Sequence, residues 1–156
     1  YTLTSVRGKI RTGSDNKEFP SNLGISVRTR NSTGSESPPF TMWGLVNEMR
    51  VNSETEIGVD RESQKRGENR LEVFQAQGLR LNLRYMPNFF ADAWKIEGIT
   101  LILEFKDQFG NLHPTFGNKT IVFSNAYGFL NNEYQIMDCI TDGSFAPLTA
   151  TIKKIN

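Results

Sequence analysis

Hydrophobic and polar residues alternate with a period of two along several short segments of this chain. The longest of these segments covers residues 99–105. Its hydrophobic positions are Ile99, Leu101, Leu103 and Phe105, and Thr100 and Glu104 lie between them. Only an extended strand places every second side chain on the same face. The segment therefore predicts a half-buried strand, followed by a turn at residues 107–111.

Three further segments, at residues 6–11, 23–30 and 79–84, alternate in the same way. Each places arginine, lysine or asparagine between hydrophobic residues, which predicts a strand with one buried face and one charged face. Turns rich in Gly, Pro, Asn and Asp separate the strands, and a short helix competes with a strand only at residues 45–49. The sequence predicts an all-β fold with little helix: an antiparallel β-sandwich of about eight strands, such as a jelly roll.

The length of 156 residues predicts a single domain that spans residues 1–156. A Ser-, Gly- and Pro-rich segment near residues 31–39 predicts a flexible loop, and a highly charged segment near residues 60–69 predicts a solvated loop. No apolar run approaches the roughly 18 residues that a membrane span needs. Because the sequence starts at Tyr1, we expect a trimmed domain or a processed mature protein. As a binding module, it is expected at the cell surface or outside the cell.

The residues that could perform nucleophilic catalysis are few. His113 is the only histidine and lies in a turn-rich loop, and Cys139 is the only cysteine and lies among apolar residues. A solvated histidine and a small buried cysteine are the simpler interpretations, although the fold could still bring the two together. One His and one Cys cannot complete a usual zinc site, and phosphate-binding loop motifs are absent. We therefore predict that the protein is not an enzyme and has no catalytic residue.

Calcium is the one cofactor for which the loops offer candidate ligands. Asp15 and Glu18 lie in one loop and Asp107 lies in another, and calcium binds carboxylate and carbonyl oxygens. The same residues also form ordinary turns, which is the simpler interpretation. We expect no other metal or cofactor.

Basic residues provide the strongest surface signal. If the first two strands are neighbours, one solvated sheet face carries Arg7, Lys9, Arg11, Arg28 and Arg30. Arg80 and Arg84 lie on the outer face of a third strand. Such a face would attract anionic lipid head groups or sulfated glycans, or it would simply keep the sheet soluble. The net charge of only +1 and the lack of interleaved aromatic residues argue against nucleic acid.

Aromatic residues gather around Pro87 at a predicted loop. The group consists of Tyr85, Phe89, Phe90 and Trp94. Aromatic side chains at a sandwich loop can insert into a membrane interface or stack on a sugar ring. The alternative is that they close one end of the hydrophobic core, with Phe90 and Trp94 as the members best suited to burial.

Two segments resemble a known family. Residues 6–15, Val-Arg-Gly-Lys-Ile-Arg-Thr-Gly-Ser-Asp, resemble the first strand and the Thr-Gly-x-Asp loop of PLAT-type domains, which are C2-like β-sandwiches. Residues 93–101 are similar to a later Trp-x-Ile/Leu-x-x-Ile strand of the same domains. The resemblance implies an eight-stranded sandwich that docks on lipids or membrane-associated proteins, sometimes with calcium in its loops. The chain departs from the family at residues 17–22, where the Gly-Ala-Gly-Thr-Asp element is replaced, so no calcium ligand is carried over.

Together these patterns predict a non-catalytic binding or targeting module that recognises an anionic lipid surface, a glycan or a protein partner. One alternative is a structural or assembly domain of a larger secreted, toxin or shell protein, which would form oligomers. Another is a carbohydrate-binding module, for which Trp43 and Trp94 are the candidate stacking residues.

Overall fold

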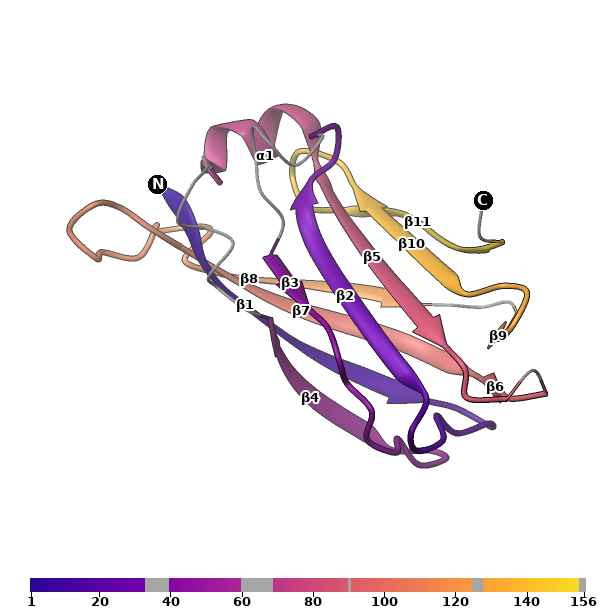
Figure 1. Ribbon diagram of the computed structural model, residues 1–156. Helices are drawn as coiled ribbons and strands as arrows, with labels where there is room; N and C mark the ends of the chain where they lie inside the picture. Colours follow the sequence, from indigo (N-terminus) through magenta and orange to yellow (C-terminus); the bar gives the residue numbers. More distant parts are fainter. Residues whose placement is uncertain (33–39, 60–68, 90, 125–127, 155–156) are drawn as a thin grey trace.

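The computed structural model describes residues 1–32, 40–59, 69–89, 91–124 and 128–154. These residues form eleven strands and one helix, and most of the strands belong to two antiparallel sheets that pack against each other (Figure 1). The predicted all-β sandwich is therefore confirmed. Among the described residues, no helix is long and apolar enough to cross a membrane. Of the two predicted loops, only residues 31, 32 and 69 are described, and Phe90 also lies outside the described residues.

The first sheet has four strands in the order β4–β1–β7–β8. Their bounds are Glu54–Val59 (β4), Thr2–Thr12 (β1), Ile96–Lys106 (β7) and Asn118–Ser124 (β8). The alternating segment at residues 99–105 forms most of β7, and its four hydrophobic positions are buried as predicted. Val6 and Ile10 of β1 lie opposite Leu103 and Ile99 of β7. Two alternating strands thus build the centre of this sheet.

The second sheet has five strands in the order β11–β10–β5–β2–β3. Their bounds are Pro147–Lys153 (β11), Ile136–Thr141 (β10), Leu79–Met86 (β5), Asn22–Thr29 (β2) and Phe40–Met42 (β3). Leucine, isoleucine and valine side chains of β2 and β5 face the other sheet and are buried. Two short strands, β6 (Ala93–Trp94) and β9 (Leu130–Asn131), pair with each other. In Figure 1 they lie near the end of the sandwich where β5 and β7 are joined.

The helix α1 (Leu71–Gln77) covers the opposite end of the core (Figure 1). Its Phe74 ring packs against Phe105 and Phe145, with ring centroids 5.6 and 6.1 Å apart. Gly78 caps the C-terminus of the helix: its positive φ of 90° suits glycine, and its N–H donates to the Phe74 carbonyl. The short helix considered at residues 45–49 does not form. Met49 instead exchanges two backbone hydrogen bonds with Lys17, which holds it extended.

Candidate functional site on the outer sheet faces

The basic residues predicted to share one face lie on two different faces. β1 and β2 belong to opposite sheets, so their outward side chains point away from each other. Arg7, Lys9 and Arg11 lie on the outer face of the four-stranded sheet, whereas Arg28, Arg80 and Arg84 lie on that of the five-stranded sheet. Arg30 follows β2, and its carbonyl accepts a hydrogen bond from Arg80 Nε at 3.3 Å. The premise that β1 and β2 are neighbours was wrong, because the chain crosses between the sheets after β1.

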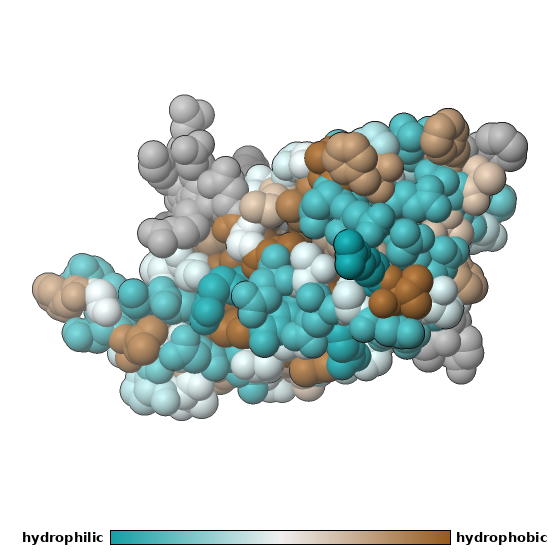
Figure 2. Space-filling view, turned by 90° about the horizontal axis from the view of Figure 1, so that it is seen from below, coloured by the Kyte–Doolittle hydropathy of each residue, from teal (hydrophilic) through white to brown (hydrophobic). Residues whose placement is uncertain are grey.

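Acidic side chains balance the basic ones on the outer face of the four-stranded sheet. The edge strand β4 places Glu56 opposite Lys9 and Glu54 opposite Arg11. The Lys9 ammonium lies 3.6 Å from the Glu54 carboxylate and 3.9 Å from that of Glu56. Seen from below, on the side of β4 and β1, the molecule is largely hydrophilic with separate hydrophobic spots (Figure 2). This face is charged but close to neutral.

The outer face of the five-stranded sheet concentrates arginine instead. The register of β2 and β5 places Arg28 directly opposite Arg80, and Gly24 directly opposite Arg84. Arg80 is bound by Asp138 at 2.7 Å, and Lys153 shares the same carboxylate at 3.1 Å. Among the described residues Arg84 has no ion-pair partner, and the buried Nε atom of Arg28 has no hydrogen-bond acceptor. Positive charge on this face is therefore only partly compensated.

Trp43 lies on the same face, directly over Gly24. A β-carbon at Gly24 would overlap Cε3 and Cζ3 of the indole and would lie 2.8 Å from Cδ2. A β-carbon that approached the Cε3–Cζ3 edge in the plane of the ring would lie farther from Cδ2, so these distances place the flat of the ring over the glycine. Trp43 nevertheless keeps 58% of its surface exposed. One face of the indole thus rests on the sheet, and the other is open beside the Gly24–Arg84 pair.

Two of the predicted aromatic ligand-binding residues are unavailable to a ligand. Tyr85 and Trp94 are fully buried, their ring centroids are 5.6 Å apart, and Trp94 Nε1 donates to Thr12 Oγ1 at 3.2 Å. Burial also raises the pKa of Tyr85 to about 12. These rings close one end of the core, which was the alternative interpretation. Phe89 is exposed in the loop after β5, as predicted.

The calcium candidates do not converge on one site. Asp107 accepts hydrogen bonds from the backbone of Phe109 and Asn111 and from the Asn111 amide, which lowers its pKa and accounts for it as a turn residue. Asp15 and Glu18 lie in the β1–β2 loop at the other end. No group of three or more His, Cys, Asp or Glu residues suitable for a metal exists within the part of the chain that the structure describes. Calcium binding stays an untested prediction.

Lys17 holds the β1–β2 loop from inside. Its buried ammonium donates to the carbonyl oxygens of Ser21 and Asn47, and burial lowers its pKa to about 8. Glu18 lies beside Asp92, and a hydrogen bond to that carboxyl group, together with its negative charge, raises the pKa of Glu18. Asp15 and Glu48 add further negative charge. This end of the sandwich is consequently acidic at its surface.

His113 is held by backbone hydrogen bonds, and Cys139 is buried in the core. The Nδ1 atom of His113 accepts backbone hydrogen bonds from Thr115 and Phe116, both at 3.0 Å. Cys139 is buried on the inner face of β10, and burial raises its pKa to about 12. At neutral pH its thiol therefore stays protonated and shielded, which is unsuited to nucleophilic attack.

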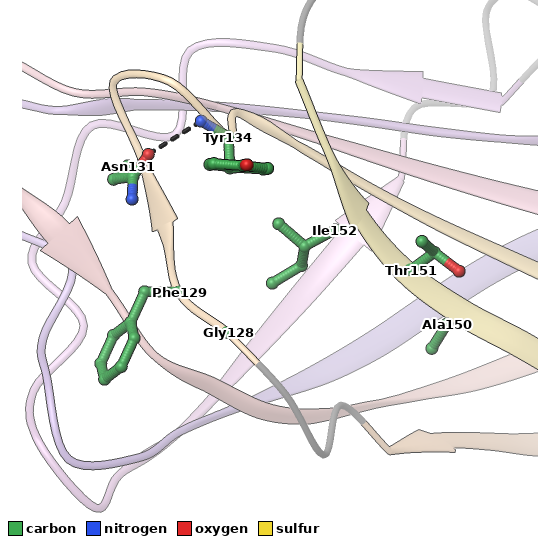
Figure 3. Close-up of a pocket in the computed structure, with 7 residues that line it drawn as sticks. All are labelled: Gly128, Phe129, Asn131, Tyr134, Ala150, Thr151 and Ile152. Carbon is green, nitrogen blue, oxygen red and sulfur yellow. Dashed lines mark hydrogen bonds between the residues drawn. The ribbon is translucent and has the colours of Figure 1, made fainter.

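An apolar groove of about 510 Å³ lies beside β11 (Figure 3). Its lining residues are Gly128, Phe129, Asn131, Tyr134, Ala150, Thr151 and Ile152. Sequence reasoning missed this groove, because its floor on β11 and its walls in the segment that contains β9 come from separate parts of the chain. The sequence suggested a carbohydrate-binding role for Trp43 but could not place it over Gly24, because the two residues are far apart in sequence.

No protein-family model, curated protein or solved structure matches the chain.

Proposed function

We propose that the protein is a non-catalytic binding module that recognises an anionic glycan on the outer face of the five-stranded sheet. The observation that carries this proposal is the exposed Trp43 indole, which lies flat over Gly24 beside Arg84. The Arg28–Arg80 pair lies four residues further along β2 on the same sheet face. The glycine matters because any side chain there would lift the ring off the sheet.

A flat, open indole suits a sugar ring. The C–H face of a pyranose is apolar and stacks on an aromatic ring, and Trp offers a large rigid surface at little cost in conformational entropy. Arginine guanidinium groups pair with sulfate or carboxylate through two parallel hydrogen bonds. A glycan that carries such groups could stack on Trp43 while its anionic substituents pair with Arg84 and Arg28.

The arrangement of the arginines supports an anionic ligand. Arg28 and Arg80 are direct cross-strand partners, and like charges in that position destabilise a sheet. Asp138 relieves this repulsion only from the side of Arg80. A bound sulfate or carboxylate near Arg28 would supply the second counter-charge.

A glycan fits this chemistry better than an anionic membrane. Membrane insertion needs aromatic side chains that project from the molecule, whereas the Trp43 ring lies along the sheet. Two projecting aromatic residues, Phe19 and Phe89, are 67% and 65% exposed and lie in loops at the acidic end near Glu18 and Asp92. A third, Phe109, is 79% exposed and lies in the turn that Asp107 closes after β7. Negative charge in these loops would repel anionic lipids.

The test is isothermal titration calorimetry with heparin-derived oligosaccharides and with their desulfated counterparts. We expect the sulfated form to bind and Trp43→Ala to weaken binding by about tenfold, because truncating a central Trp removes about 1.4 kcal/mol or more. Phe109→Ala is the matched control, since Phe109 is an exposed aromatic residue in the turn after β7. Equal affinity of the wild type and Trp43→Ala would refute the proposal, as would tighter binding to phosphatidylserine vesicles than to the oligosaccharide.

A further inference from the structure

The groove beside β11 has an apolar floor because β11 is an edge strand. Ala150 and Ile152 lie opposite Cys139 and Met137 of β10, so all four side chains point to the inner face of the sheet. Cys139 and Met137 are fully buried, whereas Ala150 and Ile152 remain partly exposed. The floor of the groove is thus the part of the inner sheet face that the described residues of the opposite sheet do not cover.

Two aromatic residues form the walls. Phe129 and Tyr134 come from the segment that contains β9, and each keeps more than a third of its surface exposed. In Figure 3 the Ile152 side chain points into the space that these two rings border. Asn131 Oδ1 accepts hydrogen bonds from the backbone N–H groups of Glu133 and Tyr134 at 2.9 and 2.8 Å, which fixes the turn that positions Tyr134. The Tyr134 wall is therefore held in place by the fold itself.

A lysine stands over each wall. The Lys95 ammonium lies 5.5 Å from the centre of the Phe129 ring and donates to the Gly128 carbonyl at 3.1 Å. The Lys154 ammonium lies 5.5 Å from the centre of the Tyr134 ring, but Glu133 pairs with it at 2.9 Å and raises its pKa. Among the described residues Lys95 has no carboxylate partner. The uncompensated charge at the groove is thus that of Lys95.

We propose that this groove binds a small amphiphilic carboxylate. The hydrocarbon body of the ligand lies on Ile152 between Phe129 and Tyr134, and its carboxylate pairs with Lys95. The volume of about 510 Å³ is typical of small-molecule sites, which combine apolar walls with a few polar groups that orient the ligand. The residues that line this groove are not part of the face around Trp43, so this proposal does not depend on the proposed glycan site.

The test is an NMR titration of the ¹⁵N-labelled protein with octanoate and, in parallel, with octanol, which has the same hydrocarbon chain and no charge. Octanoate should shift the amide resonances of Phe129, Tyr134 and Ile152 and should bind more tightly than octanol. In Lys95→Gln the affinity for octanoate should fall roughly threefold, to that of octanol, as expected for one partly exposed ion pair. Lys119→Gln on β8 is the matched control and should bind octanoate like the wild type.

Filling the groove gives an independent variant. Ile152→Trp should abolish octanoate binding, whereas Leu148→Trp, an exposed position on β11 that does not line the groove, should leave it unchanged. Trp43→Ala should also bind octanoate normally, which separates this site from the proposed glycan site. The proposal is overturned if octanoate shifts none of the groove resonances, or if Lys95→Gln keeps the wild-type preference for octanoate over octanol. The lysine substitution decides this even if Ile152→Trp fails to fold.

Discussion

The outer faces of the two sheets differ although the sequence patterns that produce them are alike. On the four-stranded sheet, Lys9 of β1 lies between two glutamates of the neighbouring strand β4. On the five-stranded sheet, Arg28 of β2 lies opposite another arginine, and Trp43 covers Gly24 nearby. The comparison shows that the charge of a basic strand is balanced or left partly uncompensated according to the strand that pairs with it.

The largest expected effect is on the reactivity of the Cys139 thiol, which reports which face of the five-stranded sheet points inward. Cys139 and Asp138 alternate on β10, so a buried thiol places Asp138, Arg80 and the arginine face outside. In the folded protein at pH 8 we expect the reaction of Cys139 with Ellman's reagent to be slowed about 1,000-fold or more relative to the unfolded chain, because it requires opening of a core strand. Rapid reaction of the folded protein would contradict this assignment of the faces.

A pair of glycine substitutions tests the two faces directly. At Gly24 a new side chain would collide with the Trp43 ring, whereas at Gly58 on β4 a new β-carbon would meet nothing within 4 Å. We expect Gly24→Val to destabilise the protein by about 1–3 kcal/mol and to weaken glycan binding about tenfold. Gly58→Val should change the free energy of unfolding by no more than about 0.5 kcal/mol. Chemical denaturation and calorimetry measure both, and equal effects at the two glycines would remove the distinction.

Reversing one charge on each face should change oligosaccharide binding by a smaller amount. Arg84→Glu should weaken binding of the sulfated oligosaccharide about fivefold, because it replaces an attractive contact by a repulsive one. Arg7→Glu, on the outer face of the four-stranded sheet, changes the net charge by the same amount and should have a much smaller effect. If both variants lose affinity for the oligosaccharide equally, the net charge of the protein determines binding, and the binding site is not confined to the five-stranded sheet.

The smallest effect concerns the neutral face. The side chains of Lys9, Glu54 and Glu56 are 40%, 50% and 81% exposed, so solvent screens their ion pairs and the pairs contribute little to stability. Lys9→Gln should lower the free energy of unfolding by less than about 1 kcal/mol and leave glycan binding unchanged. A larger loss in thermal denaturation would mean that the charge balance of this face has a structural role.

Alternation along single strands was readable from the sequence. The hydrophobic positions of β7, Ile99 to Phe105, are buried, and the charged positions of β2 and β5 face outward, because a strand imposes its period whatever its neighbours. Cys139 as a small buried residue and Trp94 as a candidate for burial follow from the same apolar surroundings. Local chemistry was enough for these predictions.

The pairing between strands that are distant in sequence could not be predicted from the sequence. Consecutive strands are usually neighbours, which made β1 and β2 a natural pair, yet β1 pairs with β4 and β7 instead. The position of Trp43 over Gly24 depends on the register of β2 and β3, and the groove depends on β11 lying at a sheet edge. Both candidate sites consist of segments far apart in sequence, so alternation within one strand could not reveal them.

The two tryptophans provide the most direct test of the central claim, that the outer face of the five-stranded sheet is the binding face. In a ¹⁵N-labelled sample the Trp43 indole is exposed on that face, whereas the Trp94 indole donates to Thr12 in the core and acts as an internal reference. On titration with a heparin-derived oligosaccharide, we predict that the Trp43 indole resonance and the amides around Arg84 shift while the Trp94 indole resonance does not. Shifts confined to β1 and β4, or an unchanged Trp43 resonance at saturation, would contradict the account.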